Sequence, residues 1–278
     1  MKVALRVWRQ RGPREPGRFV HYTVDDVRPE TTLLEALDRL NEGLAAAGEP
    51  PVAFDSDCRE GVCGACGLLV NGRPHGPVPG ATTCLLALRA FPAARTITVE
   101  PFRTFPLVRD LVVDRGALDR IVRAGGYVSV RAGSAPEANT VPVPREAAER
   151  ALDAAACIGC GACVAACPNG SASLFTGAKL AHLGLLPQGQ PEQPRRARAL
   201  VAAADREAFG GCTLHGECTT ACPKRIDLGV IAGMNREYLR AELSRWWSGE
   251  SASEAREPEG GGAGRGGGMP ADETPAQR

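Results

Sequence analysis

Apolar and polar residues alternate in two short segments near the N-terminus. Residues 2–8 (KVALRVW) and 18–24 (RFVHYTV) each place Val, Leu or Tyr at every second position. A period of two is typical of a half-buried strand. The Gly- and Pro-containing segment between them suits a turn. The pattern therefore predicts a β-hairpin.

A helical period follows in residues 31–48. One face carries four leucines: Leu33, Leu37, Leu40 and Leu44. Thr32 and Glu35 have the spacing of a capping box at the start, and Gly48 suits the C-terminal stop. Farther on, Asn71-Gly72 is a type I′ turn pair after a short apolar run, and residues 96–100 (TITVE) resemble a closing strand. These elements predict a β-grasp sheet crossed by one helix.

Four later segments favour helices. The first is residues 105–128, where Leu111, Leu118, Ile121 and Val122 are available for burial. The other three are residues 145–156, 195–209 and 226–247, the last ending in Trp246-Trp247. The long helical pattern predicts an all-α C-terminal region, so the fold class is α+β.

Composition divides the chain further. We expect a β-grasp domain over 1–105, a helical connector over 106–144 whose end (131–144) is rich in Pro, an α-helical domain over 145–248, and a Gly-rich tail over 249–278 that buries no core. No run of 18 apolar residues is present, which argues against a direct membrane span. The net charge of +1 gives no reason to expect a nucleic-acid partner.

All eleven cysteines fall into three tight groups. An odd number argues against a disulfide framework, and the N-terminal residues lack a signal peptide. We therefore expect metal-bound thiolates in reducing cytosol.

The first group has plant-type 2Fe–2S spacing. Cys58, Cys63 and Cys66 match C-x4-C-x2-C, and Cys84 supplies a distant fourth ligand. The alternatives are reduced structural cysteines or a zinc site, although zinc ligands usually come as two C-x2-C pairs. Glycines in this loop would let the backbone curl and aim its N–H groups at the sulfurs.

The second and third groups are two ferredoxin-type runs. In such runs each series binds its own cubane and lends its Pro-flanked cysteine to the other. We expect 4Fe–4S ligation by Cys157, Cys160, Cys163 and Cys222. Only three thiolates remain for the other centre: Cys167, Cys212 and Cys218.

The position of the missing thiolate is occupied by His215. A cube with one unligated corner loses an iron, which predicts a 3Fe–4S cluster. The rival is a 4Fe–4S cluster ligated by histidine, because imidazole ligates iron in Rieske centres.

Other polar residues have weaker signals. Arg59 and Glu60 would tune the first centre or dock a partner, whereas His21, His75 and His182 suit solvent-facing or packing roles. Trp246 and Trp247 fit either helix packing or an interface. The chain has no nucleotide-binding G-x-G-x-x-G after a strand and no catalytic dyad. The sequence thus indicates a carrier of single electrons without a catalytic residue or substrate site of its own.

Taken together, the chain resembles the iron–sulfur subunits of succinate dehydrogenase and fumarate reductase, menaquinone-type bacterial branch. The resemblance covers residues 2–247 and depends on the strings DCREGVCGACGLLVNGRP, PLVRDLVVD, CIGCGACVAACPNGSA and CTLHGECTTACPK. It implies an FAD-bearing flavoprotein partner that oxidises succinate in the tricarboxylic acid cycle. It also implies a path through 2Fe–2S, 4Fe–4S and 3Fe–4S centres to quinone at a membrane-anchor subunit, on the cytoplasmic face of the plasma membrane.

Two positions depart from ubiquinone-using members of that family. Those members have a tryptophan and a histidine where this chain has Ala172 and Thr213. The departure favours menaquinone. Competing hypotheses are a free-standing polyferredoxin and the iron–sulfur subunit of another oxidoreductase, such as a glycolate oxidase or heterodisulfide reductase type. Molybdenum hydroxylase subunits fit less well, since they carry a second 2Fe–2S domain.

Overall fold

The computed structural model describes residues 1–92, 96–129, 139 and 143–248. The expected tail (249–278) and most of the Pro-rich end of the expected connector (131–144) lie outside the described residues. Residues 1–242 form one compact unit, and Leu243 begins a second one. In the part of the chain that is described, no helix has both the length and the apolar composition to cross a membrane.

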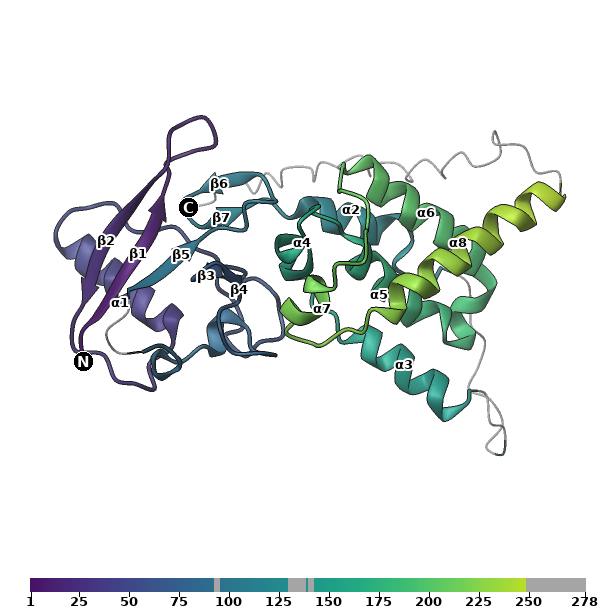
Figure 1. The fold of residues 1–278 in the computed structure, drawn as a ribbon, viewed down its shortest axis with the longest axis horizontal. Helices are drawn as coiled ribbons and strands as arrows, with labels where there is room; N and C mark the ends of the chain where they lie inside the picture. The colour runs from purple at the N-terminus through teal and green to yellow at the C-terminus, as the bar shows by residue number, and fades with distance from the viewer. Residues whose placement is uncertain (93–95, 130–138, 140–142, 249–278) are drawn as a thin grey trace, which may run out of the picture. The chain divides into compact units, whose positions relative to one another are not determined.

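The N-terminal region is a mixed sheet with one long helix (Figure 1). The sheet has the strand order β2-β1-β5-β3-β4, and β1 pairs antiparallel with β2 and parallel with β5. The strands are β1 (Val3–Arg9), β2 (Arg18–Val24), β3 (Leu69–Val70), β4 (Arg73–Pro74) and β5 (Ile97–Glu100), and the helix is α1 (Leu33–Ala46). Two short 3₁₀ helices, η1 (Thr83–Leu85) and η2 (Leu88–Ala90), precede β5. The predicted hairpin and closing strand are confirmed.

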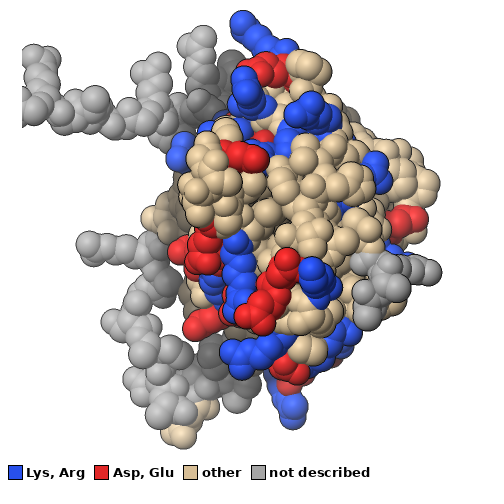
Figure 2. Space-filling model, turned by 90° about the vertical axis from the view of Figure 1, so that its left-hand side faces the viewer, with Lys and Arg blue, Asp and Glu red and all other residues tan. Residues whose placement is uncertain are grey.

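Local sequence signals explain these elements. The Thr32 side chain accepts a hydrogen bond from the Glu35 N–H, and the Glu35 carboxylate accepts from the Thr32 N–H, so the capping box is confirmed. All four predicted leucines of α1 are buried. Asn71 and Gly72 have φ values of 51° and 76°, as the turn between β3 and β4 requires. Figure 2 faces the side where β1, β2 and α1 lie in Figure 1, and shows basic and acidic side chains interspersed there.

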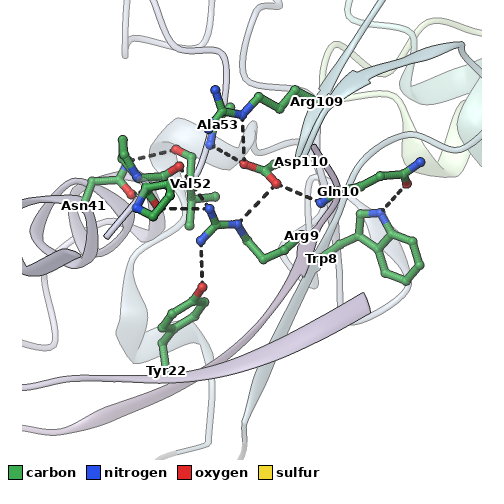
Figure 3. Close-up of polar contacts among 11 residues, drawn as sticks. Trp8, Arg9, Gln10, Tyr22, Asn41, Val52, Ala53, Arg109 and Asp110 are labelled. Atoms are coloured by element: carbon green, nitrogen blue, oxygen red, sulfur yellow. Dashed lines mark hydrogen bonds and ion pairs between the residues drawn. The ribbon is translucent and has the colours of Figure 1, made fainter. Parts of the chain in front are cut away.

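The prediction of a helix over 105–128 is wrong in its first half. Residues 107–113 form a hairpin of β6 (Leu107–Arg109) and β7 (Val112–Val113), and helix α2 covers only Gly116–Gly125. Asp110, at φ 48°, makes the turn. Its carboxylate accepts hydrogen bonds from the backbone N–H groups of Gln10 (2.8 Å) and Ala53 (3.0 Å) and from Arg9 Nε (3.2 Å), as Figure 3 shows. These long-range bonds hold the hairpin against the end of β1.

The remaining secondary-structure elements of the described chain are helices. They are α3 (Arg145–Ala155), α4 (Ala162–Ala166), α5 (Ser173–Gly184), the 3₁₀ helix η3 (Pro187–Glu192), α6 (Gln193–Arg206), α7 (Glu217–Ala221) and α8 (Gly229–Ser248). Helices α3, α6 and α8 match predicted segments to within a few residues, whereas α5 was not predicted. Trp246 and Trp247 at the end of α8 are 76% and 84% exposed and contact each other edge to face.

The buried apolar side chains of the described residues form two clusters. One includes side chains of the sheet, α1 and the loop cysteines Cys66 and Cys84. The other includes Phe102, Phe105 and side chains of α2, α5, α6 and α8. Cys160 belongs to this second cluster. Predicted ligands are thus part of both cores.

Candidate iron–sulfur centres

The first cysteine group converges on the loop between α1 and β3. Cys58 lies against Cys63, and Cys66 lies against Cys84, which η1 brings back to the loop. Cys66 and Cys84 are both 4% exposed, Cys58 is half-buried and Cys63 is exposed. The structure therefore brings together all four predicted residues at one site near the surface.

Hydrogen-bond donors surround these sulfurs. The Glu60 N–H donates to Cys58 Sγ (3.3 Å), the Ala65 N–H donates to Cys63 Sγ (3.4 Å), and Thr82 Oγ1 lies 3.1 Å from Cys84 Sγ. Backbone N–H groups of Glu60 and Val62 lower the pKa of Cys58 to about 7. Burial raises the pKa of Cys66 to about 12. Donors aimed at sulfur favour thiolates and suit a sulfur-rich anionic group.

The second site is a cavity lined by four cysteines. Three of them, Cys157, Cys160 and Cys163, come from the first ferredoxin-type run, and Cys222 comes from the second. Apolar neighbours include Leu174 and Phe175. Burial raises the pKa of Cys160 to about 12 and raises the pKa of Cys163 well above the usual thiol range. Four thiols around a cavity with apolar neighbours form the donor set that a cubane requires.

A third cavity is lined by the remaining three cysteines. Cys167 comes from the first run, and Cys212 and Cys218 come from the second. His215 also lines this cavity and is exposed at its outer edge. Burial raises the pKa of Cys218. The two runs thus exchange their Pro-flanked cysteines between the two cavities.

Matching backbone geometry in the two runs produces this exchange. Helices α4 and α7 each have five residues and each follow a left-handed glycine, Gly161 (φ 82°) or Gly216 (φ 91°). Each ends at its Pro-flanked cysteine, where the backbone becomes extended: ψ is 126° at Cys167 and 117° at Cys222. The extended residue carries its sulfur away from its own run.

Several residues that support the sites were not predicted. Asn169 Nδ2 donates to Gly211 O (3.0 Å) and Thr213 Oγ1 (2.8 Å), which holds the loop of Cys212. Lys179 Nζ donates to Cys157 O (3.1 Å). Arg115 donates to backbone carbonyls of two cysteine loops. Asn169 follows a Cys-Pro pair, which is a local signal, but Arg115 and Lys179 lie far from the cysteines that they support.

The polar residues with weaker sequence signals, Arg59, Glu60 and three histidines, lie in different environments. Arg59 makes a two-pronged ion pair with Asp38 of α1 (2.6 and 3.1 Å), so it anchors the first loop to that helix. Glu60 is exposed. His75 is buried, His182 is partly buried, and His21 faces solvent. Burial lowers the pKa of His182.

Two family models match the chain. The first describes a 2Fe–2S iron–sulfur cluster binding domain and matches residues 4–120. The second describes a 4Fe–4S dicluster domain and matches residues 153–226. Together the two matches include all eleven cysteines. The chain therefore has a ferredoxin-like 2Fe–2S region followed by a dicluster region, with mixed α and β content.

Relatives and a solved structure agree with this arrangement. The chain is 31% identical to the succinate dehydrogenase iron–sulfur subunit of Bacillus subtilis, over 76% of this chain and 82% of that protein. It is 30% identical to the fumarate reductase iron–sulfur subunit of Mycobacterium tuberculosis, over 81% and 88%. Its fold is similar to a chain of the Mycobacterium smegmatis Sdh1 complex in the apo form. That likeness has a TM-score of 0.58 at 23% identity and covers 88% of this chain and 97% of that one.

Proposed function

The chain belongs to the family of succinate dehydrogenase and fumarate reductase iron–sulfur subunits, and from this premise we propose how its eleven cysteines serve electron transfer. As a family member it is an electron-transfer subunit of an oxidoreductase complex. We assign Cys58, Cys63, Cys66 and Cys84 to a 2Fe–2S cluster. A 4Fe–4S cluster is assigned to Cys157, Cys160, Cys163 and Cys222, and a 3Fe–4S cluster to Cys167, Cys212 and Cys218. The cysteine-lined cavities with exchanged ligands carry this proposal.

The clusters supply one-electron oxidation and reduction when they are bound. The protein holds and insulates them. Apolar side chains such as Leu174 and Phe175 keep water from the second site, while N–H donors near Cys58 and Cys63 stabilise negative charge at the first site. A β-grasp domain over 1–105, a connector over 106–144 and an all-α domain over 145–248 carry these sites in the proposal.

The complex supplies what this chain lacks. We propose a flavoprotein subunit with FAD on the electron-entry side and a membrane-anchor subunit with quinone on the exit side, at the cytoplasmic face of the membrane. In this scheme the complex works as a quinone-dependent succinate dehydrogenase. Ala172 and Thr213 favour menaquinone over ubiquinone, because they replace the tryptophan and histidine expected in a ubiquinone site.

The test is low-temperature EPR on the complex purified in mild detergent, before and after succinate is added. A three-iron centre is paramagnetic when oxidised, whereas the other two centres are silent until reduced. We expect an oxidised-state signal that disappears with succinate. A signal that does not respond to succinate would indicate a flavoprotein partner with another substrate. Absence of the signal would contradict the 3Fe–4S assignment.

His215 provides a sharper test of the third centre. It lines the cavity but leads into a left-handed glycine, Gly216, in an exposed loop. We therefore expect His215→Ala to keep the three-iron EPR signal and the iron content of wild type. Loss of the third cluster in this variant, with the other two retained, would show that the imidazole is a ligand.

A further inference from the structure

Two of the cysteine loops touch through their backbones. A Cβ placed on Gly64, between Cys63 and Cys66, would lie 2.4 Å from Ile158 O and 3.1 Å from Cys160 N. No side chain fits there, because real Cβ atoms do not approach so closely. Gly64 also has a φ of 74°, which favours glycine. The loop of the first site therefore packs directly on the loop of the second.

Gly67 repeats this close approach on the other side of Cys66. A Cβ on Gly67 would lie 2.6 Å from the Phe102 ring and 3.2 Å from Cys160 O. Two glycines of the first loop thus contact the same segment of the second loop. This contact is a seam between the first two predicted cluster sites, and we call Gly64, Gly67, Ile158 and Cys160 the loop seam.

Arg115 binds both sides of the loop seam. Its Nη1 donates to Gly64 O on one loop (2.5 Å) and to Cys160 O on the other (3.2 Å). Its Nη2 lies 3.5 Å from Ala65 O. Arg115 stands between β7 and α2, at the N-terminal cap position of that helix. Its side chain therefore reaches the seam from a third segment of the chain.

The guanidinium suits this position. It is planar, always charged, and presents five donors in a rigid arrangement. Hydrogen bonds from an ionised donor are stronger than neutral ones. Removing the donor would leave carbonyl groups at the seam without this partner, and unsatisfied buried acceptors are costly. One nitrogen, Nη1, reaches both loops, and Nη2 adds a second contact to the first loop at Ala65 O. Lysine, with one nitrogen on a flexible stem, reproduces neither this second contact nor the fixed plane of the guanidinium.

We propose that Arg115 is a positioning residue for electron transfer, which holds the first and second cluster sites at a fixed short separation by clamping the loop seam. The inference rests on the proposed function, in which one electron leaves the first site and enters the second. The rate of electron tunnelling falls steeply with distance. A loosened seam would therefore slow this step without removing any cysteine ligand.

The experiment compares Arg115→Met with wild type in the purified complex. Both clusters are reduced with dithionite, and the magnetic coupling between them is measured by pulsed EPR as relaxation enhancement of the 2Fe–2S signal. Iron and acid-labile sulfide are measured on the same samples. We expect full cluster content with weaker and more broadly distributed coupling. Arg120→Met is the matched control, because it removes an arginine that pairs with Glu207 and does not bond to the seam.

A second pair of variants changes the seam at one of its glycines instead of at Arg115. Gly64→Ala adds a methyl group where 2.4 Å separates it from Ile158 O, so it should also weaken the coupling. Gly72→Ala has the same left-handed strain, at φ 76°, with no atom within 4 Å of the added carbon. It should leave the coupling unchanged, which separates loop contact from backbone strain.

Unchanged coupling in a fully loaded Arg115→Met complex would overturn the proposal. If that variant does not load, Arg115→Lys and Gly64→Ala decide on the same criterion. Failure of all three to load, while both controls load, would assign Arg115 to folding and overturn the positioning role. Absence of the reduced-state signals from wild type would instead contradict the proposed clusters, so the two failures are distinguishable.

Discussion

At the scale of single residues, His75 shows how the fold sets a protonation state. Its side chain is 1% exposed, with Nδ1 3.0 Å from Thr83 Oγ1 and accepting from the Thr83 N–H at 3.3 Å. The ring contacts Phe102 edge to face. Burial, with a smaller contribution from the Arg115 charge, lowers the pKa of His75 from 6.5 to about 4. The imidazole is therefore neutral at pH 7.

This lowered pKa predicts a loss of stability in acid. Between pH 6.5 and about 4 the unfolded chain binds a proton at His75 that the folded chain does not. The stabilisation is thus complete above pH 6.5 and falls as the pH decreases, by roughly 3 kcal/mol at the lower end. We expect His75→Gln to flatten this part of the pH dependence, measured as the thermal midpoint at about pH 7 and about pH 5.

His21 is the control for that measurement. It lies on β2 with its side chain exposed, so His21→Gln should keep the acid-dependent loss seen in wild type. A wild-type slope that persists unchanged in His75→Gln would assign the effect to other groups.

At the scale of elements, the β6–β7 hairpin depends on one carboxylate. Asp110 is 2% exposed and accepts from Arg9 and from the N–H groups of Gln10 and Ala53. Removing one partner of a buried ion pair typically costs 3 kcal/mol or more, since the remaining groups lose their partner. We expect Asp110→Ala to lower the free energy of unfolding by about 3 kcal/mol, measured by urea unfolding with circular dichroism.

An exposed aspartate provides the comparison. Asp25 pairs with Lys2 at 3.3 Å, but both side chains are more than half exposed. Exposed pairs contribute about 0–1 kcal/mol. Asp25→Ala should therefore change the urea midpoint little. A similar small change for Asp110→Ala would mean that the hairpin is held by its apolar contacts, such as buried Leu111.

The elements also show which patterns the sequence could reveal. Helix α1 was predictable because its cap and its leucine stripe are local. The β6–β7 hairpin was missed because its turn depends on partners about 100 residues away, at the end of β1 and just after it. Helix α5 was missed for a different reason: it buries Leu174, Phe175, Gly177 and Leu180 on several sides, so it lacks an amphipathic period. Gly177 is needed there because Val230 O would lie 2.8 Å from an added Cβ.

The predicted sites follow the same division. Cysteine spacing is a local code, so the three cysteine sets could be predicted, and the structure gathers each set. The supporting residues could not be predicted. Arg115 reaches carbonyl oxygens 45 and 51 positions away. Every residue has a backbone carbonyl, so such an acceptor cannot be recognised from the residue types of its loop.

At the scale of the whole molecule, the two ferredoxin-type runs are interdependent. Each cysteine-lined cavity has ligand candidates from both runs, so neither run can complete a site alone. The segment between them includes α5 and α6, whose side chains contribute to the second core cluster. Cys163 lies near both Cys222 of its own cavity and Cys218 of the other. The two sites are therefore neighbours within one core.

This exchange predicts opposite effects for equivalent substitutions. Cys167→Ser alters the first run, but the affected cavity is the third site, so we expect loss of the three-iron EPR signal with the 4Fe–4S signal retained. Cys222→Ser alters the second run, and we expect it to impair the 4Fe–4S cluster and retain the three-iron signal. Both follow because serine replaces a thiolate that only one cavity uses. EPR of oxidised and reduced complex measures the two signals separately, and Thr220→Ser, which changes no cysteine, is the control. If each substitution instead removed the cluster of its own run, the ligands would not be exchanged, and the assignment of all seven cysteines in these runs would have to be revised.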